Sequence, residues 1–406
     1  MAIDSKVVIV SACRTPFDKF GGVMRELSSI QLAVESMKNV VDRINFKKED
    51  VDVIYYGTAV PSEEGQYGNS PGRQALLKAG FPSDTTTLTV DRACCSSMAA
   101  FQIAYKDLLL GECDVAMAVG SENLSNVPIL MPSKVRWGVK AMDVVSWDPM
   151  AHVGYDDWNP VSVDTENVAN RYGITREEMD AWSVNSHQRY FAAKEAGNFD
   201  SEVVPFKIVD KKGNETIMEY DVSPRQDTSM EKMAKLKPVY GTKIITAGNA
   251  PGLNAGSSAI LMMREETAKE YGLEPLAYVK AIAAVASEAE NIPTVPAKAI
   301  QQLVKRAGIT IQDVDVIEIN EAFSAMPLVS TKILADGDEA ELARLRSITN
   351  VNGGAVAIGH PMGATGARLI MTTMYELIRR GGGIGCAALC GGLAQGDGVM
   401  LEVPKK

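Results

Sequence analysis

The sequence predicts an α/β protein built from two similar halves, with a long insertion between them. Strand-like and helix-like stretches alternate with short connections, a pattern typical of a mainly parallel sheet covered by helices. A hexapeptide of the first half, E-D-V-D-V-I at 49–54, returns almost unchanged as Q-D-V-D-V-I at 312–317. The order of predicted elements around the two hexapeptides is also the same, which indicates a duplicated fold.

The first half opens with a buried β-branched strand at 6–13 and an amphipathic helix at 28–44, followed by the strand that the hexapeptide begins. A second helix, 96–110, ends at Gly111 and leads into a strand at 114–119. Glycine after the last helical turn is typical of a left-handed helix end.

The second half repeats this order of elements. The predicted stretches are a strand at 276–286, a helix at 297–307, a strand at 316–319, a helix at 364–380 and a strand at 384–389. Three consecutive glycines follow the second helix, so this helix also stops at glycine.

The insertion, about 122–251, follows neither pattern. It is rich in Met, Trp and Pro and predicts one clear helix, because Thr175 and Glu178 form a capping box before an amphipathic run that ends at Gly197. An irregular segment of this length inside a compact chain is typical of a functional insertion. The chain therefore divides into residues 1–121 with 252–273, residues 122–251, and residues 274–406.

Composition excludes several classes of function. The chain has 406 residues, of which 46% are hydrophobic and 23% charged, as is usual for a globular enzyme. Its net charge of −10 argues against nucleic-acid and anionic-membrane partners, which need clustered positive charge. No apolar run approaches the roughly 20 residues that cross a bilayer. The N-terminus leads directly into a strand without a cleavage site, so we expect a cytoplasmic protein.

The cysteines and histidines do not predict a metal site. The six cysteines lack paired C-x-x-C spacing, and the three histidines are scattered along the chain. Free thiols in a reducing compartment are the better interpretation.

Three motifs carry the candidate chemistry. D-R-A-C-C-S-S-M places Cys94 at the start of a helix, where unpaired N–H groups and the helix dipole favour a thiolate. N-G-G-A-V-A-I-G-H-P-M-G places His360 in a glycine-rich turn, and a histidine near a thiol can take its proton. A-L-C-G-G adds Cys390 at a strand end. Two sulfur atoms that handle protons indicate chemistry beyond simple hydrolysis.

With three further motifs, the chain resembles the thiolases, enzymes that join or cleave acyl-CoA thioesters by Claisen chemistry. The six motifs occur in family order: the cysteine box at 91–98, E-N-V-A at 166–169, T-A-G-N-A at 246–250, N-E-A-F at 320–323, G-H-P-M-G at 359–363 and C-G-G at 390–392. The resemblance implies the thiolase-like fold: duplicated βαβαβαββ halves in α/β/α/β/α layers, with an inserted loop domain that covers the active site and grips CoA.

The resemblance also implies roles for individual residues. Cys94 matches the nucleophile that carries the acyl group, and His360 matches the group that accepts its proton. Asn320 would hold a water that forms the first oxyanion pocket with His360, although a helix cap is the alternative for an Asn here. Cys390 matches the second cysteine, which moves the proton of the acetyl carbon. Backbone N–H groups of Cys94 and Gly392 would form the second oxyanion pocket.

Contacts to CoA and substrate follow the family less closely. Arg225 matches an arginine near the adenine and 3′-phosphate, with an exposed pair to Asp227 as the alternative. Pro160 stands where acetoacetyl-CoA-specific members have a histidine, and Val161 adds apolar surface beside it. Pro251 stands where a CoA-contacting serine is common.

The function implied is cleavage of 3-oxoacyl-CoA by CoA in fatty-acid β-oxidation, with CoA as a substrate and no cofactor. Alternatives are an acetoacetyl-CoA-forming acetyl-CoA C-acetyltransferase, a thiolase for aromatic or branched 3-oxoacyl-CoA, and a non-catalytic acyl-CoA-binding subunit. Four side chains are candidates for the acyl tunnel or, alternatively, for the core of the loop domain: Met142, Trp147, Met150 and Trp158.

Partners other than acyl-CoA and CoA are copies of the chain. The resemblance implies a homodimer or a homotetramer, and V-P-I-L-M at 127–131 is similar to a tetramer-forming loop. An accessory subunit is compatible with the sequence.

Overall fold

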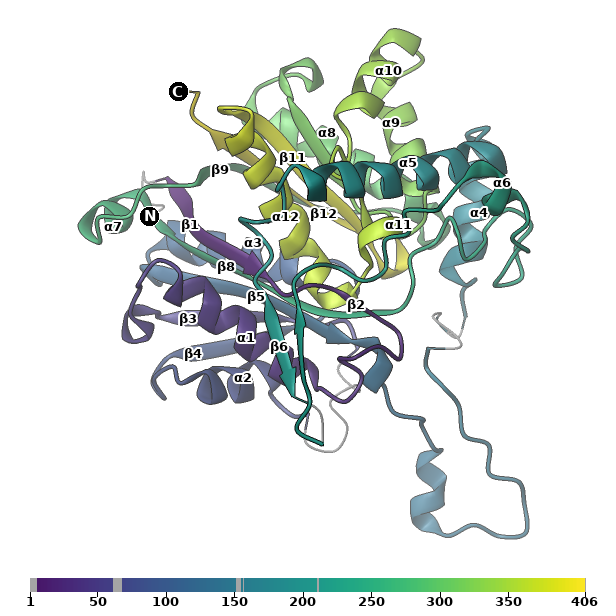
Figure 1. Cartoon of the computed structure of the whole chain (residues 1–406), viewed down its shortest axis with the longest axis horizontal. Helices are drawn as coiled ribbons and strands as arrows, with labels where there is room; N and C mark the ends of the chain where they lie inside the picture. Colours follow the sequence, from purple (N-terminus) through teal and green to yellow (C-terminus); the bar gives the residue numbers. More distant parts are fainter. Residues whose placement is uncertain (1–5, 61–67, 151–154, 156, 210–211, 406) are drawn as a thin grey trace.

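The computed structural model describes residues 6–60, 68–150, 155, 157–209 and 212–405. Two similar halves lie side by side in it, and the insertion lies along one side of both (Figure 1). Within the described residues, ten strands form one continuous sheet in which the halves occupy opposite ends.

The first half has the sheet order β4-β3-β5-β8-β1. Its elements are β1 (Val7–Arg14), α1 (Ser29–Asp42), β3 (Val53–Gly57), α2 (Pro71–Ala79), β4 (Thr86–Val90), α3 (Ser96–Leu110), β5 (Val115–Asn123) and β8 (Asn254–Arg264), with the two-residue strand β2 (Asp18–Lys19) beside β8. A short α7 (Glu265–Glu270) follows β8. The predicted helix at 96–110 is confirmed, and it ends at Gly111 in the left-handed conformation, φ +73°.

The second half has the mirrored order β9-β12-β11-β10. Its elements are β9 (Ala277–Ala286), α8 (Val295–Ala307), β10 (Val316–Ile319), α9 (Ala325–Ala335), α10 (Glu339–Ile348), α11 (Ala355–Ile358), α12 (Met362–Arg379), β11 (Gly383–Gly391) and β12 (Gln395–Val403). The counterpart of β4 is reduced to a single parallel bridge between Ile317 and Thr349.

The two hexapeptides occupy equivalent places, which confirms the duplication. Each forms a short 3₁₀ turn, at Lys48–Asp50 and at Ile311–Asp313, and then enters the second strand of its half, β3 or β10. A Val-Asp pair, Val51-Asp52 or Val314-Asp315, links turn and strand in both halves.

The expectation of a mainly parallel sheet is wrong. Only β3–β4, β3–β5 and β10–β11 pair in parallel in the described sheet, whereas β8, β9 and β12 pair antiparallel with their neighbours. Helical crossovers join the parallel strands, but β12 follows β11 through a tight connection and must run back beside it. The halves join through two residue pairs between β1 and β9.

The layers follow the prediction. Helices α1 and α2 cover the outer face of the first half of the sheet, and α8, α9 and α10 cover the outer face of its second half. Helices α3 and α12 pack together between these two halves of the sheet, in a core to which both halves of the chain contribute. Helix α12 is buried at every position from Gly363 to Leu377. A Cβ atom at Gly366 would lie 2.6 Å from the backbone N of Met98, so glycine permits this close approach.

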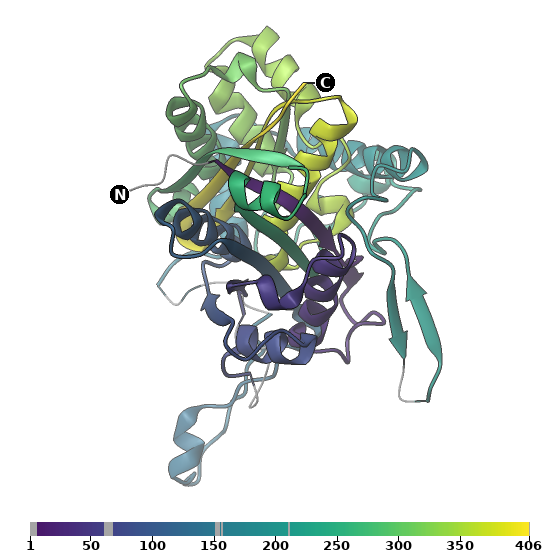
Figure 2. The same cartoon turned by 90° about the vertical axis from the view of Figure 1, so that its left-hand side faces the viewer.

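The insertion contains more structure than the single predicted helix. Helix α5 (Arg176–Glu195) begins at the predicted capping box of Thr175 and Glu178, which is confirmed. The sequence pattern did not predict α4 (Val161–Arg171), α6 (Met230–Ala234) or the hairpin of β6 (Phe206–Val209) with β7 (Glu215–Met218). The segment 127–150, here named the arm, projects away from the body (Figures 1 and 2).

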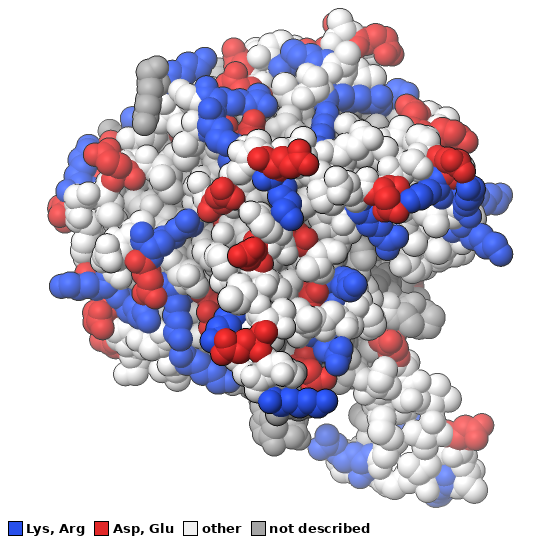
Figure 3. Space-filling view, in the orientation of Figure 1, with Lys and Arg blue, Asp and Glu red and all other residues white. Residues whose placement is uncertain are grey.

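The surface shows no segregation of charge on the face drawn in Figure 3, where basic and acidic side chains are interspersed. Among the described residues, no helix has the length and apolar character needed to cross a membrane.

Candidate active site

Cys94 lies in a tight turn between β4 and α3. Ser96 Oγ accepts a hydrogen bond from the backbone N of Arg92 at 2.9 Å, and the backbone N of Ala93 donates to Asp91 Oδ1 at 2.9 Å. Ala93 itself has φ +48°, a left-handed conformation that costs an alanine about 1 kcal/mol. The surrounding bonds hold this strained turn, and the turn presents the Cys94 thiol ahead of the helix.

His360 lies between α11 and α12, next to that thiol. Its backbone N donates to Asn254 Oδ1 at 2.9 Å, its Nε2 is 3.2 Å from Cys94 Sγ, and its Nδ1 is 2.7 Å from Thr365 Oγ1. The Thr365 hydroxyl donates its proton to the carbonyl of Pro361 at 2.9 Å, so its oxygen accepts from Nδ1–H. The proton on Nδ1 leaves Nε2 as the acceptor for the Cys94 thiol.

The electrostatics differ from the sequence-based expectation. Cys94 was expected to have a lowered pKa at a helix start, and this is wrong, because burial raises its pKa and negative charge on Cys390 and Glu122 would raise it further. The helix itself begins only at Ser96. Burial lowers the pKa of His360 to about 3, with a smaller contribution from Arg368. At neutral pH the resting pair is therefore a thiol hydrogen-bonded to a neutral imidazole.

Asn320 and Cys390 complete the group around His360. Asn320 follows β10, and its Nδ2 lies 3.4 Å from His360 Nε2. Its buried Oδ1 has no hydrogen-bond partner among the described residues, so this acceptor can bind a water or a substrate group. Cys390 is the penultimate residue of β11, with its Sγ 3.9 Å from Met326 Sδ, and burial raises its pKa to about 12.

Gly392 lies against the Cys94 turn. A Cβ atom there would lie 3.3 Å from the Cβ of Ala93 and would overlap the hydroxyl of Tyr155. The missing side chain of Gly392 therefore leaves room for the loop after Cys390 to lie close to the turn that carries Cys94. The structure thus brings together four of the predicted catalytic residues and Gly392, although they come from both halves of the chain.

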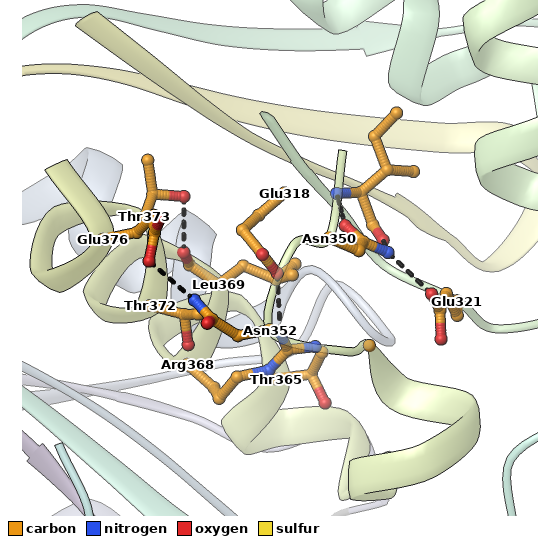
Figure 4. A network of polar contacts seen from close by, with 12 residues as sticks. Glu318, Glu321, Asn350, Asn352, Thr365, Arg368, Leu369, Thr372, Thr373 and Glu376 are labelled. Carbon is orange, nitrogen blue, oxygen red and sulfur yellow. Dashed lines mark hydrogen bonds and ion pairs between the residues drawn. The ribbon is translucent and has the colours of Figure 1, made fainter. Parts of the chain in front are cut away.

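A buried polar network holds the second-half residues in place (Figure 4). Arg368 on α12 donates to Glu318 on β10 at 3.0 Å, and both side chains are about 1% exposed. The Asn350 side chain accepts a hydrogen bond from the backbone N of Ile319 and donates one to the carbonyl of Ile319, both at 2.8 Å. These contacts fix the end of β10, where Asn320 emerges, against the helix that follows His360.

Two candidate substrate contacts lie at the start of α4. Val161, its first residue, is partly buried against the apolar cluster that contains Cys390 and Met326. Pro160 is exposed immediately before the helix. Pro251 is half-buried, three residues before β8.

Arg225, the candidate CoA contact, lies exposed in a loop beside α5, and its backbone N donates to His187 Nδ1 at 3.2 Å. Asp227 forms its ion pair with Lys232 rather than with Arg225. In the described part of the chain, no group of three or more Asp, Glu, His or Cys side chains could hold a metal ion.

Two of the candidate tunnel residues lie elsewhere. Met142 and Trp147 belong to the arm and are 53% and 45% exposed, so they do not line the site of their own chain. Trp158 is 51% exposed beside α4, and Met150 is partly exposed at the end of the arm. The apolar character of the segment did not distinguish a projecting arm from a tunnel wall.

Two residues that support the site, Thr365 and Glu122, were not predicted from the sequence. Thr365 fixes the His360 tautomer, and its only sequence signal is its place five residues after the histidine. The buried carboxylate of Glu122 accepts from the backbone N of Ala59 at 2.7 Å and of Gly363 at 2.9 Å. Glu122 therefore joins the first half to the turn that holds His360. The sequence signal for this role was a glutamate next to the predicted apolar strand.

Comparison with known proteins agrees with this geometry. Residues 7–266 match the family model described as thiolase, N-terminal domain, and residues 273–403 match thiolase, C-terminal domain. The chain belongs to the thiolase family. The resemblance drawn from the six motifs is confirmed, and as a thiolase the chain is an acyltransferase.

Relatives and solved thiolase structures span the whole chain. An acetyl-CoA acetyltransferase of Syntrophomonas wolfei is 36% identical, over 98% of this chain and 99% of the relative. A probable acetyl-CoA acyltransferase of Staphylococcus aureus is 34% identical, over 92% and 93%. The crystal structure of human mitochondrial 3-ketoacyl-CoA thiolase superposes with a TM-score of 0.91 at 31% identity, over 98% and 99%. The thiolase-like fold is thereby confirmed.

Proposed function

We propose that this thiolase cleaves 3-oxoacyl-CoA with CoA, giving acetyl-CoA and a shortened acyl-CoA, through an acyl group carried on Cys94. The observation that carries the proposal is the 3.2 Å contact between Cys94 Sγ and His360 Nε2, with the tautomer set by Thr365. This arrangement lets the imidazole take the thiol proton as the sulfur attacks.

In the first half-reaction, the Cys94 sulfur attacks the 3-keto carbon while its proton moves to His360 Nε2. The carbon–carbon bond between C2 and C3 then breaks, and its electron pair stays on C2 as the enolate of acetyl-CoA. Cys390 gives its proton to C2, and acetyl-CoA leaves. The unpaired Oδ1 of Asn320 supports the proposed water in the first oxyanion pocket.

In the second half-reaction, the thiol of an incoming CoA attacks the acyl carbon on Cys94. Cys390, left as a thiolate, takes the proton of the CoA thiol, the bond from the acyl carbon to Cys94 Sγ breaks, and the shortened acyl-CoA departs. His360 returns its proton to the Cys94 sulfur, which restores both thiols. These steps balance with thiols and one imidazole, so the proposed reaction uses CoA as a substrate and needs no metal or redox cofactor. Arg225, an exposed cation, is the proposed contact for the CoA 3′-phosphate.

A second candidate is condensation of two acetyl-CoA molecules, the reverse direction. Several relatives carry the name acetyl-CoA acetyltransferase, which favours this candidate. Against it, Pro160 and Val161 provide an apolar surface in place of a hydrogen-bonding side chain, and Val161 packs on the cluster that contains Cys390. We therefore propose a preference for medium-chain, branched or aromatic 3-oxoacyl groups, with a role in cytoplasmic β-oxidation.

The two candidates predict different substrate profiles. Each additional buried methylene contributes about 0.8 kcal/mol to binding, so a six-carbon acyl chain gains roughly tenfold or more in kcat/KM. Thiolysis should be measured across acetoacetyl-, 3-oxohexanoyl- and an aromatic 3-oxoacyl-CoA. Acetoacetyl-CoA as the best substrate, with longer chains excluded, would reject the preference and leave the second candidate.

We propose that the active form is a homodimer or a homotetramer, with an accessory subunit still compatible. Strand β4 is an edge strand of the described sheet, and edge strands offer unpaired backbone groups for pairing with another chain. The arm exposes Ile129, Met131 and Trp137 by 59%, 59% and 82%, an apolar surface typical of an interface.

The acyl-enzyme gives the direct test. Brief incubation with acetyl-CoA, followed by acid quench and peptide mass spectrometry, should find an acetyl group on Cys94 and none in a Cys94→Ala variant. Acetylation at Cys95 or Cys390 instead would overturn the assignment. Loss of label with added CoA, together with appearance of acetyl-CoA, would establish the second half-reaction.

A further inference from the structure

The turn that carries Cys94 is tied to the opposite half of the molecule by one ion pair. Arg92 Nη1 lies 2.9 Å and 3.2 Å from the two carboxylate oxygens of Asp397. The Asp397 side chain is 1% exposed, and that of Arg92 is 35% exposed. The two residues are 305 positions apart in the sequence, and neither belongs to the proposed catalytic group.

Asp397 lies beside the second cysteine. On β12 it is paired with Leu389 of β11, and the preceding residue, Gly396, is paired with Cys390. The ion pair therefore connects a position two residues before Cys94 to a strand in direct register with Cys390. A weaker contact runs alongside it, from Cys95 Sγ to the carbonyl of Leu389 at 3.9 Å.

Both cysteine loops adopt backbone conformations that need external support. Ala93 has φ +48° before Cys94, and Leu393 and Ala394 have φ +57° and +53° after Cys390. Left-handed non-glycine residues persist only where neighbouring contacts over-determine them. Arg92 and Asp397 flank these strained residues, on the turn and on the strand respectively, and so supply a contact that fixes one loop against the other.

We propose that Arg92 and Asp397 form a positioning pair that sets Cys94 against Cys390 for the carbon–carbon bond step. The inference rests on the proposed function. Acylation of Cys94 by a simple thioester uses the thiol, the oxyanion donors and His360, which Thr365 and Asn254 hold from other directions, but it does not use Cys390 as the acid or base for carbon. Making or breaking the carbon–carbon bond needs both sulfurs within reach of one substrate, and a misplacement of about 1 Å can cost on the order of 100-fold in rate.

The pair also gives that step a pH dependence. Burial raises the pKa of Asp397 to about 6, against the opposing effects of Arg92 and Lys106, and Cys95 is the other titratable group that faces it. Protonation of Asp397 removes the charge that binds Arg92. As the pH falls through about 6, thiolysis should therefore decline relative to acetylation.

The test compares the two activities in one set of variants. Asp397→Asn removes the ion pair without a change of size, and Arg92→Gln removes it with a shorter polar side chain. The double variant completes a double-mutant cycle. The matched control is Glu402→Gln, which removes the exposed ion pair of the same strand with Lys280. Acetylation of Cys94 by acetyl-CoA is measured in a single turnover by quench and mass spectrometry, and thiolysis of acetoacetyl-CoA by loss of its absorbance.

We expect each single variant to acetylate Cys94 within about twofold of wild type and to lose roughly 10- to 100-fold in thiolysis. The double variant should lose no more than either single variant, and Glu402→Gln should change neither rate. In Asp397→Asn, the ratio of thiolysis to acetylation should no longer fall below pH 6.

Equal losses in the two activities would overturn the proposal, because the pair would then act on Cys94 alone. Unchanged thiolysis would overturn it as well. Arg92→Gln, at the more exposed end of the pair, decides the matter if Asp397→Asn does not fold. A wild-type protein that acetylates Cys94 but performs no thiolysis would contradict the proposed function itself, an outcome that the variants are not needed to detect.

Discussion

Replacing Thr365 with valine should disable the base without altering the size of the side chain. The Thr365 hydroxyl accepts from His360 Nδ1–H at 2.7 Å and donates to the carbonyl of Pro361 at 2.9 Å, and Thr365 is fully buried. In Thr365→Val the imidazole loses its partner and either keeps an unsatisfied Nδ1–H or moves the proton to Nε2. The second tautomer cannot accept the Cys94 proton.

The magnitude follows from these two contacts. A hydrogen bond contributes about 0.5–1.5 kcal/mol, and a buried donor left unsatisfied costs about 1–3 kcal/mol. Together these correspond to about 2–4 kcal/mol on the barrier, or roughly 30- to 1,000-fold in the rate of Cys94 acetylation. The assay is single-turnover acetylation by acetyl-CoA, with Thr365→Ser as the control that keeps the hydroxyl. Acetylation by the valine variant within twofold of the serine variant would refute the reasoning.

Three further outcomes can be measured on the same protein. Cys390→Ala should still acetylate Cys94 but should lose about 10²–10⁴-fold in thiolysis, since it lacks the general acid, and near-normal thiolysis would mean that another group moves the proton. The pKa of His360 is lowered to about 3 in the folded chain, so only the unfolded chain binds this proton as the pH falls below about 6.5. Wild type should therefore lose stability between pH 7 and 5, by up to about 1.4 kcal/mol per pH unit from this histidine. Urea unfolding should show a smaller loss for His360→Asn over the same range. Light scattering should give a mass two or four times that of the 43.6 kDa chain. If the protein is a tetramer, replacing both Ile129 and Met131 of the arm with Asp should convert it to a dimer. A monomeric wild type would contradict the assembly proposal.

The sequence predicted the regular elements well where local patterns decide them. The capping box at Thr175, the glycine end at Gly111 and the strand before Asn320 all lie where periodicity and turn chemistry placed them. The predicted strand direction was wrong because direction depends on which strands become neighbours in the folded sheet. Strand β8 pairs with β5 only after the whole insertion, so the local pattern did not reveal this antiparallel pair.

The candidate site was predictable as a set of residues but not as an electrostatic environment. Cys94, His360 and Cys390 could be selected from motifs that carry their own chemistry. The raised pKa of Cys94 depends on its burial in the folded chain and on the charges of Cys390 and Glu122, which lie outside the cysteine motif. The positions of Met142 and Trp147 depend on whether an apolar segment folds inward or projects, and the sequence pattern is the same in both cases.

The sheet of the first half has a consequence for how the protein is made. Strands β1 and β5 both depend on β8 as their common neighbour, yet β8 comes from residues 254–264, after the whole insertion has been synthesised. Cys94 also contacts His360, which lies 266 residues later in the chain. A nascent chain therefore cannot complete its first sheet, or enclose its reactive thiol, until most of the polypeptide has left the ribosome. Such distant contacts slow folding, and they leave apolar strand edges exposed to chaperones for much of synthesis.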